Sequence, residues 1–258
     1  MLKFKSIAII IAVFFSLWAA SCSRPVSIGQ ITGRVLPVDS ISAPLPDPLI
    51  DSILAGFRTA MGQEMNQVLA VSAFPIMRAS PEGLLNNFVA DLVFETAQTL
   101  YKPEDGVMPD FCVLNYGGLR ANLPKGNITM GNVYELMPFE NEIVIVTLTG
   151  QKTWELLQFL AASQRGMPVS GLTLKIQNQQ VAEARVQGEL FDMSRNYKIV
   201  TSDFLAKGGD RMTFFLDPLE ITMVGKRVRE AIINHMKAAS QRGEVLAPVL
   251  DGRMKIIE

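Results

Sequence analysis

Residues 115–123 read NYGGLRANL, and their types and spacing suit the binding of a ligand. This stretch follows the apolar run FCVL at 111–114, where a strand is expected to end. Two adjacent glycines allow the backbone to turn sharply or to come close to a ligand. Arg120 has a planar guanidinium that can hold phosphate oxygens through two hydrogen bonds. A tight turn that carries a solvated arginine is the alternative interpretation.

Three further stretches have a similar character: MPFEN at 137–141, SDFLAKGGDR at 202–211 and LDGRMKII at 250–257. Each is a weak signal by itself. A phenylalanine after a proline, such as Phe139, can serve as a core plug, and so can Phe204. An aspartate after two glycines, such as Asp210, can simply form a turn.

Residue counts exclude several kinds of catalytic site. The sequence contains one histidine, His235, so it does not supply the imidazoles of a multi-histidine metal centre, and a Ser-His-Asp arrangement would have to use this one residue. No G-x-x-x-x-G-K-[ST] loop is present to hold phosphates. His235 falls on an expected helix, where it is assigned a surface or capping role. A net charge of -1 and a pI of about 6.0 provide no basic face for nucleic acid.

Taken in this order and spacing, the four stretches resemble the C-terminal, nucleotide-binding domain of the 5′-nucleotidase family. The similarity runs through GNITMGNVYELMPFENEIVIVTLTG and YKIVTSDFLAKGGD, and it loosely covers residues 68–257. It implies an α+β fold in which four layers form an α/β/β/α sandwich.

The resemblance assigns roles in a substrate pocket. Asn115 and Arg120 match the asparagine and arginine of N-x-G-G-x-R, which line that pocket in the family. Gly117 and Gly118 would then let the backbone turn with the ligand close by.

Two aromatic residues and one carboxylate complete this implied pocket. Phe139 and Phe204 correspond to the two rings that hold the base between them, and stacking on an aromatic ring is worth ~1–3 kcal/mol per base. Asp210 matches the carboxylate that accepts hydrogen bonds from the ribose hydroxyls, a role that suits an ionised acceptor.

The stretch RASPEGLLNNFVAD at 78–91 departs from the family pattern E-x-x-x-G-N-x-x-x-D and its arginine-containing lead. Asn86 replaces the glycine, and Arg78 stands four residues before Glu82 where the commoner spacing is three. Arg78 is therefore a candidate phosphate ligand at an unusual spacing. Glu82, Asn87 and Asp91 are expected to cap and pack the helix that begins here.

Hydrophobic periodicity predicts the elements that must position these stretches. Helices are predicted at about 48–61, 82–100, 151–162 and 226–240. Strands are predicted at 68–74, before the glycine turn, at 142–150, and near 172–176, 182–186 and 197–201. Interleaved helices and hairpin-like strands indicate one mixed α+β domain of roughly 210 residues, covering 48–258.

Residues 1–22 are typical of a secretion signal with a lipobox-like cysteine. Lys3 and Lys5 precede an apolar stretch at 7–20, which is shorter than the ~20 residues of a transmembrane helix. The ending AASC resembles a bacterial lipobox, with Ala19 at the place of the usual leucine. Cys22 is therefore predicted to be lipidated and to become the mature N-terminus. An uncleaved N-terminal anchor helix is the alternative.

Residues 23–47 are rich in Ser, Pro and Gly and are predicted to form a tether, with a short strand near 31–36. Cys112 is then the only other cysteine, so the mature chain cannot form an intramolecular disulfide. Its place in an apolar strand predicts a packing residue rather than a nucleophile.

The resemblance also implies a catalytic half that these residues do not contain. Full-length members carry an N-terminal metallophosphoesterase domain whose two metal ions activate water and hold the phosphoryl oxygens. Residues 23–67 are too few to supply it. No cofactor is expected in this chain, and divalent metals are expected only on a separate metallophosphoesterase chain.

Three function classes follow from these observations. The first is the nucleotide- or nucleoside-binding subunit of a split 5′-nucleotidase, exported to the cell envelope and lipid-anchored. The second is a lipid-anchored nucleotide or nucleoside binding protein without a hydrolase partner. The third is a scaffold whose pocket is a relic. None of the three involves a nucleic-acid polymer.

Overall fold

The computed structural model describes residues 33, 35, 47–163 and 165–258. The predicted signal and Cys22 therefore lie outside the described residues, and so does the predicted strand near 31–36 apart from residues 33 and 35. The chain divides into two units, Met1–Asp51 and Ser52–Glu258, and the sheets belong to the second unit.

The helices are α2 (Pro48–Met65), α3 (Leu84–Leu100), α4 (Met130–Leu136), α5 (Gly150–Ala162), α6 (Asp203–Ala206) and α7 (Val228–Gln241). The strands are β1 (Val68–Ser72), β2 (Phe111–Val113), β3 (Gly126–Thr129), β4 (Glu142–Leu148), β5 (Val169–Ser170), β6 (Leu172–Gln177), β7 (Gln180–Val186), β8 (Glu189–Leu190), β9 (Tyr197–Ser202), β10 (Glu220–Arg227), β11 (Val245–Leu246) and β12 (Met254–Ile256). The predicted helices and strands from residue 48 onward all form, with ends shifted by a few residues. The periodicity did not predict the shorter helices α4 and α6 or the strands β3, β5, β8, β10, β11 and β12.

The centre of the second unit is a five-stranded sheet in the order β10-β4-β9-β2-β5. β2 runs parallel to β9, whereas β4 is antiparallel to β9 and β5 is antiparallel to β2. Two smaller sheets have the orders β11-β1-β3 and β12-β6-β7-β8.

Alternation along the central strands divides the apolar side chains between two cores. In β4, Ile143 and Ile145 face one core, while Val144 and Val146 face the other. Full burial of such a side chain is worth roughly 1.5–3 kcal/mol, which explains why a run of alternating β-branched residues fixes the register of this strand.

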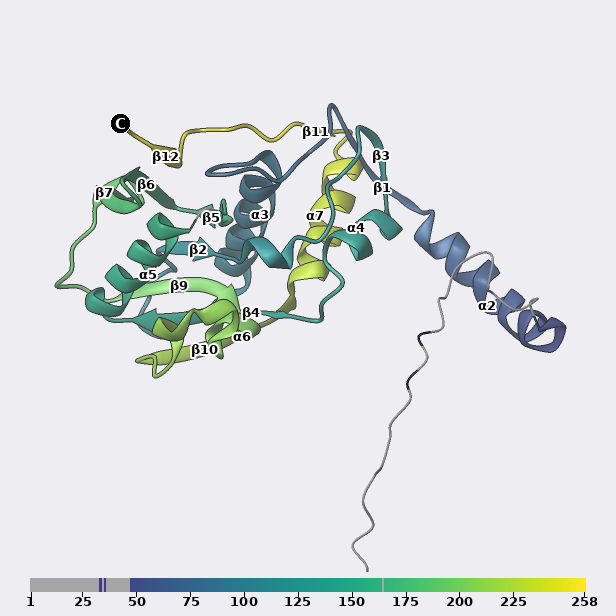
Figure 1. Cartoon of the computed structure of the whole chain (residues 1–258), viewed down its shortest axis with the longest axis horizontal. Helices are drawn as coiled ribbons and strands as arrows, with labels where there is room; N and C mark the ends of the chain where they lie inside the picture. Colours follow the sequence, from purple (N-terminus) through teal and green to yellow (C-terminus); the bar gives the residue numbers. More distant parts are fainter. Residues whose placement is uncertain (1–32, 34, 36–46, 164) are drawn as a thin grey trace, which may run out of the picture. The chain divides into compact units, whose positions relative to one another are not determined.

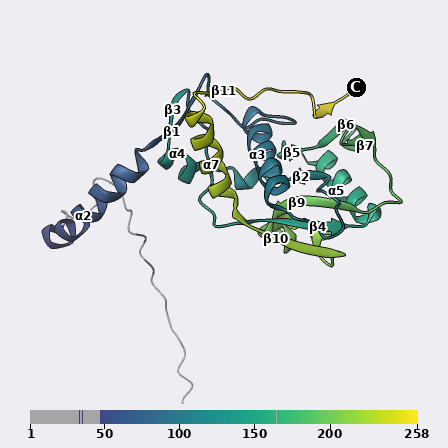
Figure 2. The same cartoon turned by 180° about the vertical axis from the view of Figure 1, so that it is seen from behind.

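Helices cover the central sheet on both of its faces. The first core is closed by α3 and α7, which lie side by side (Figures 1 and 2). The second core is closed by α5 and by the sheet that contains β6 and β7. The predicted α+β fold class is confirmed.

Cys112 is completely buried in the core beneath α3, so the prediction of a packing residue is confirmed. Burial raises the pKa of its thiol, since the thiolate would lose its hydration.

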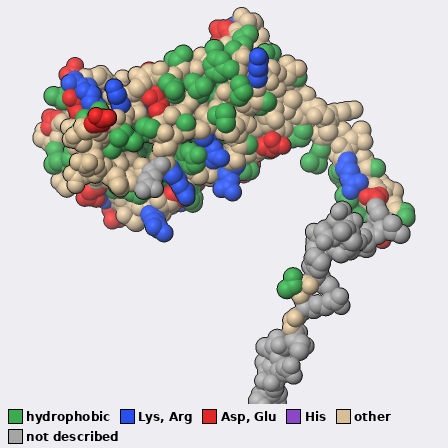
Figure 3. All heavy atoms as spheres, turned by 45° about the horizontal axis from the view of Figure 1, so that its top comes forward, with side chains coloured by type: hydrophobic (Ala, Val, Ile, Leu, Met, Phe, Trp, Pro, Cys, Tyr) green, Lys and Arg blue, Asp and Glu red, His purple; other side chains and the backbone are tan. Residues whose placement is uncertain are grey.

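Helix α2 forms as predicted, but none of its residues is buried. Its apolar side chains recur at helical spacing and are exposed; they are Leu49, Ile50, Ile53, Leu54, Phe57 and Met61. None of the helices in the described part of the chain is long and apolar enough to cross a membrane. On the face drawn in Figure 3, lysine and arginine side chains are interspersed with acidic ones.

The acidic side chains near the start of α3 hold the C-terminal segment rather than the helix end. The N-cap of α3 is Gly83 without a side-chain hydrogen bond, so the expected capping by Glu82 is wrong. Glu82 instead accepts hydrogen bonds from the backbone N–H groups of Asp251 and Gly252, both at 3.0 Å.

The segment LDGR is held to α3 by an ion-pair network. Arg253 pairs with Asp91 at 2.6 Å and with Asp251 at 2.7 Å. Asn87 donates to the carbonyl of Val249 at 3.1 Å. Burial opposes the charge on Arg253, but the two carboxylates outweigh it, so the pKa of Arg253 lies above its ordinary value. Asn87 is buried as expected of a packing residue, whereas Asp91 is exposed and contributes through its ion pair with Arg253.

Candidate functional site

The strand order of the central sheet brings four loops to one edge. Because β2 and β9 are parallel, their carboxyl ends lie at the same edge, with Asn115 following β2 and Phe204 following β9. β4 and β5 are antiparallel to these strands and begin at that edge, where Ile143 pairs with Ser202 and Val113 pairs with Val169.

A cavity of about 290 Å³ lies where these loops meet. Its lining residues are Asn115, Gly117, Gly118, Arg120, Phe139, Asn141, Arg165, Phe204 and Asp210. Four stretches that are far apart in the sequence thus contribute to one concave site. Of the residues predicted to bind substrate, all except Arg78 are in this lining.

The turn after β2 is a 3₁₀ helix, Tyr116–Gly118, and its geometry explains one of the two glycines. A Cβ on Gly118 would stand 2.7 Å from Oδ1 of Asn115, which is closer than real Cβ contacts. A Cβ on Gly117 would meet its nearest atom, Oδ2 of Asp210, at an ordinary 3.5 Å. Gly118 therefore makes room for the asparagine side chain.

A hydrogen bond joins the glycine turn to the loop that follows α6. Nδ2 of Asn115 donates to Oδ2 of Asp210 at 2.6 Å, across 95 residues of sequence. This bond orients the aspartate and leaves its other carboxylate oxygen available for a ligand hydroxyl.

Left-handed backbone conformations shape the loop that carries Phe204. Gly208 has a φ of 83°, while Asp210 and Arg211 have φ angles of 51° and 65°. This region is uncommon for residues other than glycine, although aspartate tolerates it better than most. A Cβ on Gly209 would approach the Phe204 ring to 2.5 Å and the Phe204 carbonyl oxygen to 2.6 Å. The ring is thus packed directly on the backbone of Gly209.

Arg229, at the start of α7, holds the loop that carries Phe139. Its buried guanidinium donates to the carbonyls of Met137 and Phe139, both at 3.2 Å, and it forms an ion pair with Glu140. The hydrogen bond from Arg229 holds the pKa of the Glu140 carboxyl below its usual range. The backbone N–H of Arg120 bonds the carbonyl of Leu136 at 2.8 Å, so this loop is also tied to the glycine turn.

Both aromatic rings are accessible at the cavity. Phe139 is 39% exposed and Phe204 is 42% exposed, so neither is the core plug that the sequence left open. The guanidinium of Arg120 lies 6.0 Å from the centre of the Phe139 ring.

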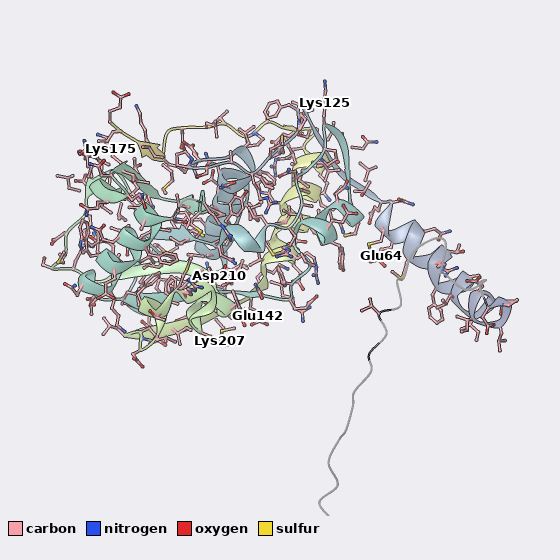
Figure 4. All side chains as sticks on the ribbon, in the orientation of Figure 1. Glu64, Lys125, Glu142, Lys175, Lys207 and Asp210 are labelled. Carbon is pink, nitrogen blue, oxygen red and sulfur yellow. The ribbon has the colours of Figure 1, made fainter. Side chains whose placement is uncertain are left out.

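Asp203 links the two loops that carry these rings. It accepts a hydrogen bond from the backbone N–H of Glu142 at 3.1 Å and pairs with Lys207 at 3.0 Å. In Figure 4, Asp210 lies at the same end of the unit as Glu142 and Lys207.

Arg78 lies behind the glycine turn and is not among the residues that line the cavity. Its guanidinium donates to the carbonyl of Leu119 and stands 4.8 Å from the centre of the Tyr116 ring. In this position Arg78 supports the turn.

Two lining residues, Asn141 and Arg165, were not predicted from the sequence. Asn141 ends the stretch MPFEN, and its carbonyl accepts a bond from Val228 at 2.9 Å. Arg165 belongs to the loop between α5 and β5, where no motif marks it. A correct prediction that β5 pairs with β2 would have placed this loop at the site.

A larger cavity of about 580 Å³ lies between α3, β10 and α7, and His235 is in its lining. His235 is partly exposed at the surface and packs edge-on against Phe88 at 5.5 Å, and its partial burial lowers the pKa of the imidazole. Cations of this cavity are already neutralised, since Arg242 pairs with Glu244 at 2.7 Å and Lys226 pairs with Glu230 at 3.2 Å. This cavity is the larger of the two, but the smaller one contains two arginines, Arg120 and Arg165, that have no ion pair within the described residues.

Comparison with known proteins agrees with this geometry. The family model described as "5′-nucleotidase, C-terminal domain" matches residues 62–217, which is more than half of the chain. The chain belongs to this family. The match covers Asn115, Phe139, Phe204 and Asp210.

Relatives of this family member are much longer proteins. An apyrase from Tabanus yao is 25% identical over 237 residues, which cover 82% of this chain and 42% of the apyrase. Protein UshA of Escherichia coli is 30% identical over 108 residues, covering 39% of this chain and 19% of UshA. A cell wall protein of Listeria monocytogenes, Lmo0130, is 28% identical over 188 residues, covering 67% of this chain and 23% of that protein.

Solved structures show the same fold. A 5′-nucleotidase precursor from Thermus thermophilus superposes with a TM-score of 0.68 at 24% identity, covering 81% of this chain and 43% of that one. The chain matches the apyrase and the nucleotidase precursor over most of its own residues, yet it spans less than half the length of either protein.

Substitution of Gly209 tests the packing of the Phe204 ring. Gly209→Ala should lower the free energy of unfolding by about 1–3 kcal/mol, because the new methyl group overlaps both the ring and the Phe204 carbonyl. Urea unfolding measures the loss, and hydrogen exchange should show it concentrated in residues 203–212.

Gly62→Ala is the matched control, since a Cβ at Gly62 meets nothing within 4 Å on the exposed helix α2. It should leave the stability unchanged or slightly higher. Equal unfolding midpoints for both variants would contradict the packing of Phe204 on Gly209.

Proposed function

We propose that this chain binds a nucleotide or nucleoside in the 290 Å³ cavity. The observation that supports it best is the pair of half-exposed rings, Phe139 and Phe204, on two separately fixed loops at one cavity. Every nucleobase has a π-face, so two such rings can hold a base without regard to its identity.

The polar groups of the lining suit the rest of a nucleotide. Asp210 presents a fixed carboxylate that can accept hydrogen bonds from sugar hydroxyls. Arg120 presents a guanidinium that can pair with phosphate oxygens in a bidentate manner. The family resemblance assigns the sugar-hydroxyl role to Asp210 and places Arg120 in the lining of the pocket.

Titration calorimetry with AMP and adenosine tests this proposal. Phe204→Ala should weaken both ligands by similar factors, because loss of stacking costs ~1–3 kcal/mol, or about one to two decades in Kd, whether or not a phosphate is present. Arg120→Ala should weaken AMP more than adenosine, since it removes a charge-assisted contact that the nucleoside lacks.

Phe57→Ala is the matched control, because Phe57 is an exposed ring on α2 and does not line the cavity. It should bind both ligands like the wild type. The proposal fails if neither AMP nor adenosine binds the folded wild-type chain at millimolar concentration, or if both cavity variants bind like the wild type.

We also propose that the chain is the recognition subunit of a split 5′-nucleotidase, with a separate metallophosphoesterase chain that carries the divalent metals. The lining of the cavity supports this division of labour. It offers rings, amides and guanidinium groups that bind, with Asp210 as its one carboxylate. A lipid-anchored binding protein without a hydrolase partner is the second candidate function.

An activity measurement separates these two candidates. The purified chain with added divalent metal ions should release no more phosphate from AMP than a buffer control, because its single histidine and its binding residues do not supply a two-metal centre. Adding the metallophosphoesterase expected from the neighbouring reading frame should produce turnover. Strong metal-dependent turnover by this chain alone would overturn the split-enzyme proposal.

The proposed location is the cell envelope, with a lipid on Cys22. Support comes from the signal-like composition of residues 1–22 and from the similarity to a protein named as a cell wall protein. Several acyl chains on one cysteine would anchor the protein firmly, whereas one chain alone binds a membrane only marginally.

Fractionation tests the anchor. Cys22→Ser should move the protein from the membrane fraction to a soluble or uncleaved form, whereas Cys112→Ala, which keeps Cys22, should remain with the membrane. Mass spectrometry of the mature N-terminus gives the modification directly. A mature chain with an unmodified Cys22 would rule out the anchor.

A further inference from the structure

Two arginines, Arg120 and Arg165, line the cavity. Several arginines elsewhere pair with carboxylates at 4 Å or less, among them Arg185, Arg195, Arg227, Arg229, Arg242 and Arg253. Within residues 47–163 and 165–258, no ion pair involves Arg120 or Arg165. Arg211, directly after the lining residue Asp210, likewise has no ion pair there.

Unpaired arginines give the cavity an excess of positive charge. Its ionised side chains are Arg120, Arg165 and Asp210, so two positive charges and one negative charge leave a formal net charge of +1. Asp210 forms an ion pair with neither guanidinium within the described residues, and its carboxylate accepts a hydrogen bond from the amide of Asn115 instead. One phosphate on Arg120 would leave Arg165 without a counter-charge.

The loop of Arg165 is held firmly although the side chain is exposed. Nδ2 of the buried Asn86 donates to the carbonyl of Gly166 at 2.6 Å. A Cβ on Gly166 would stand 2.2 Å from the carbonyl oxygen of Ala79, so the backbone is packed tightly there. The backbone of Leu114 bonds the carbonyl of Pro168 at 2.9 Å.

These contacts fix the position of the backbone from which the Arg165 side chain extends. The loop is attached to α3 on one side and to the glycine turn on the other, so the Cα of Arg165 is held at the edge of the cavity. Less conformational entropy is then lost when its side chain orders on a ligand. The replacement of the family's glycine by Asn86 thus has a local consequence, which is to anchor this loop.

We propose that Arg165 is a second anion-contacting residue of the cavity and that it selects nucleotides with a second phosphoryl group over nucleoside monophosphates. This inference rests on the proposed nucleotide-binding function. Arg120 binds one anionic group, and Arg165 binds the next through a charge-assisted hydrogen bond.

The test compares Arg165→Gln with the wild type by calorimetry, using adenosine, AMP, ADP and inorganic pyrophosphate. The glutamine keeps hydrogen-bonding capacity and removes the charge. ADP should bind the variant roughly ten- to a hundredfold more weakly, the range for a lost hydrogen bond to a charged group, while adenosine should be unchanged. The wild type should also lose affinity for ADP more steeply with salt than the variant does.

Arg185→Gln is the matched control, because it removes the same charge from an exposed arginine that pairs with Glu183 at 3.0 Å and does not line the cavity. It should bind all four compounds like the wild type. Circular dichroism should show both variants folded, since the Arg165 side chain has no bond in the described structure that its removal would break.

Pyrophosphate separates the two ways in which the test can fail. If the wild type binds pyrophosphate and Arg165→Gln does not, Arg165 is an anion-contacting residue even where adenosine and AMP fail to bind and the proposed nucleotide function is lost. The role of Arg165 is overturned if the variant binds ADP and pyrophosphate like the wild type. It is also overturned if adenosine weakens as much as ADP.

Discussion

The parallel pairing of β2 with β9 is the constraint on which the candidate site depends. Two parallel neighbours must end at the same edge of a sheet, so this pairing brings Asn115 and Phe204 together although they are far apart in the sequence. β4 and β5, antiparallel to these strands, add Phe139 and Arg165 at the same edge. The alternating apolar residues of these strands therefore determine both the two cores and the place where the binding groups meet.

Local backbone features then hold the rings in positions that the hydrophobic effect alone would not favour. Phe139 and Phe204 both remain partly exposed, which leaves apolar surface in water. Bonds from Arg229 to the main chain fix the first ring, and packing on Gly209 fixes the second. Asp210 and Arg211 adopt left-handed backbone conformations, which are strained for residues other than glycine. Such strain is common at ligand-binding sites.

Much of this arrangement could be predicted from the sequence, and the failures have physical reasons. Periodicity predicted the long helices and central strands because their burial is regular. It missed α4, a seven-residue helix that begins with a reciprocal cap between Thr129 and Asn132. Motif spacing identified the residues on three loops, but Arg165 reaches the site only through the position of β5 beside β2, which no local pattern encodes.

Hydrogen bonds hold the lining loops in place before a ligand binds, so the site resembles a rigid receptor. Arg229 and Asn86 hold main-chain carbonyls of two lining loops, and Asn115 holds the Asp210 side chain. A ligand that enters such a cavity orders few protein groups, so more of the stacking and ionic free energy appears as affinity. Because the backbone of the ring-bearing loops is fixed without the side chains of Arg120 and Arg165, contacts to the base and contacts to anionic groups can contribute separately. Selectivity for the charge of a ligand can then change through a single loop, such as that of Arg165, without disturbance of the rings.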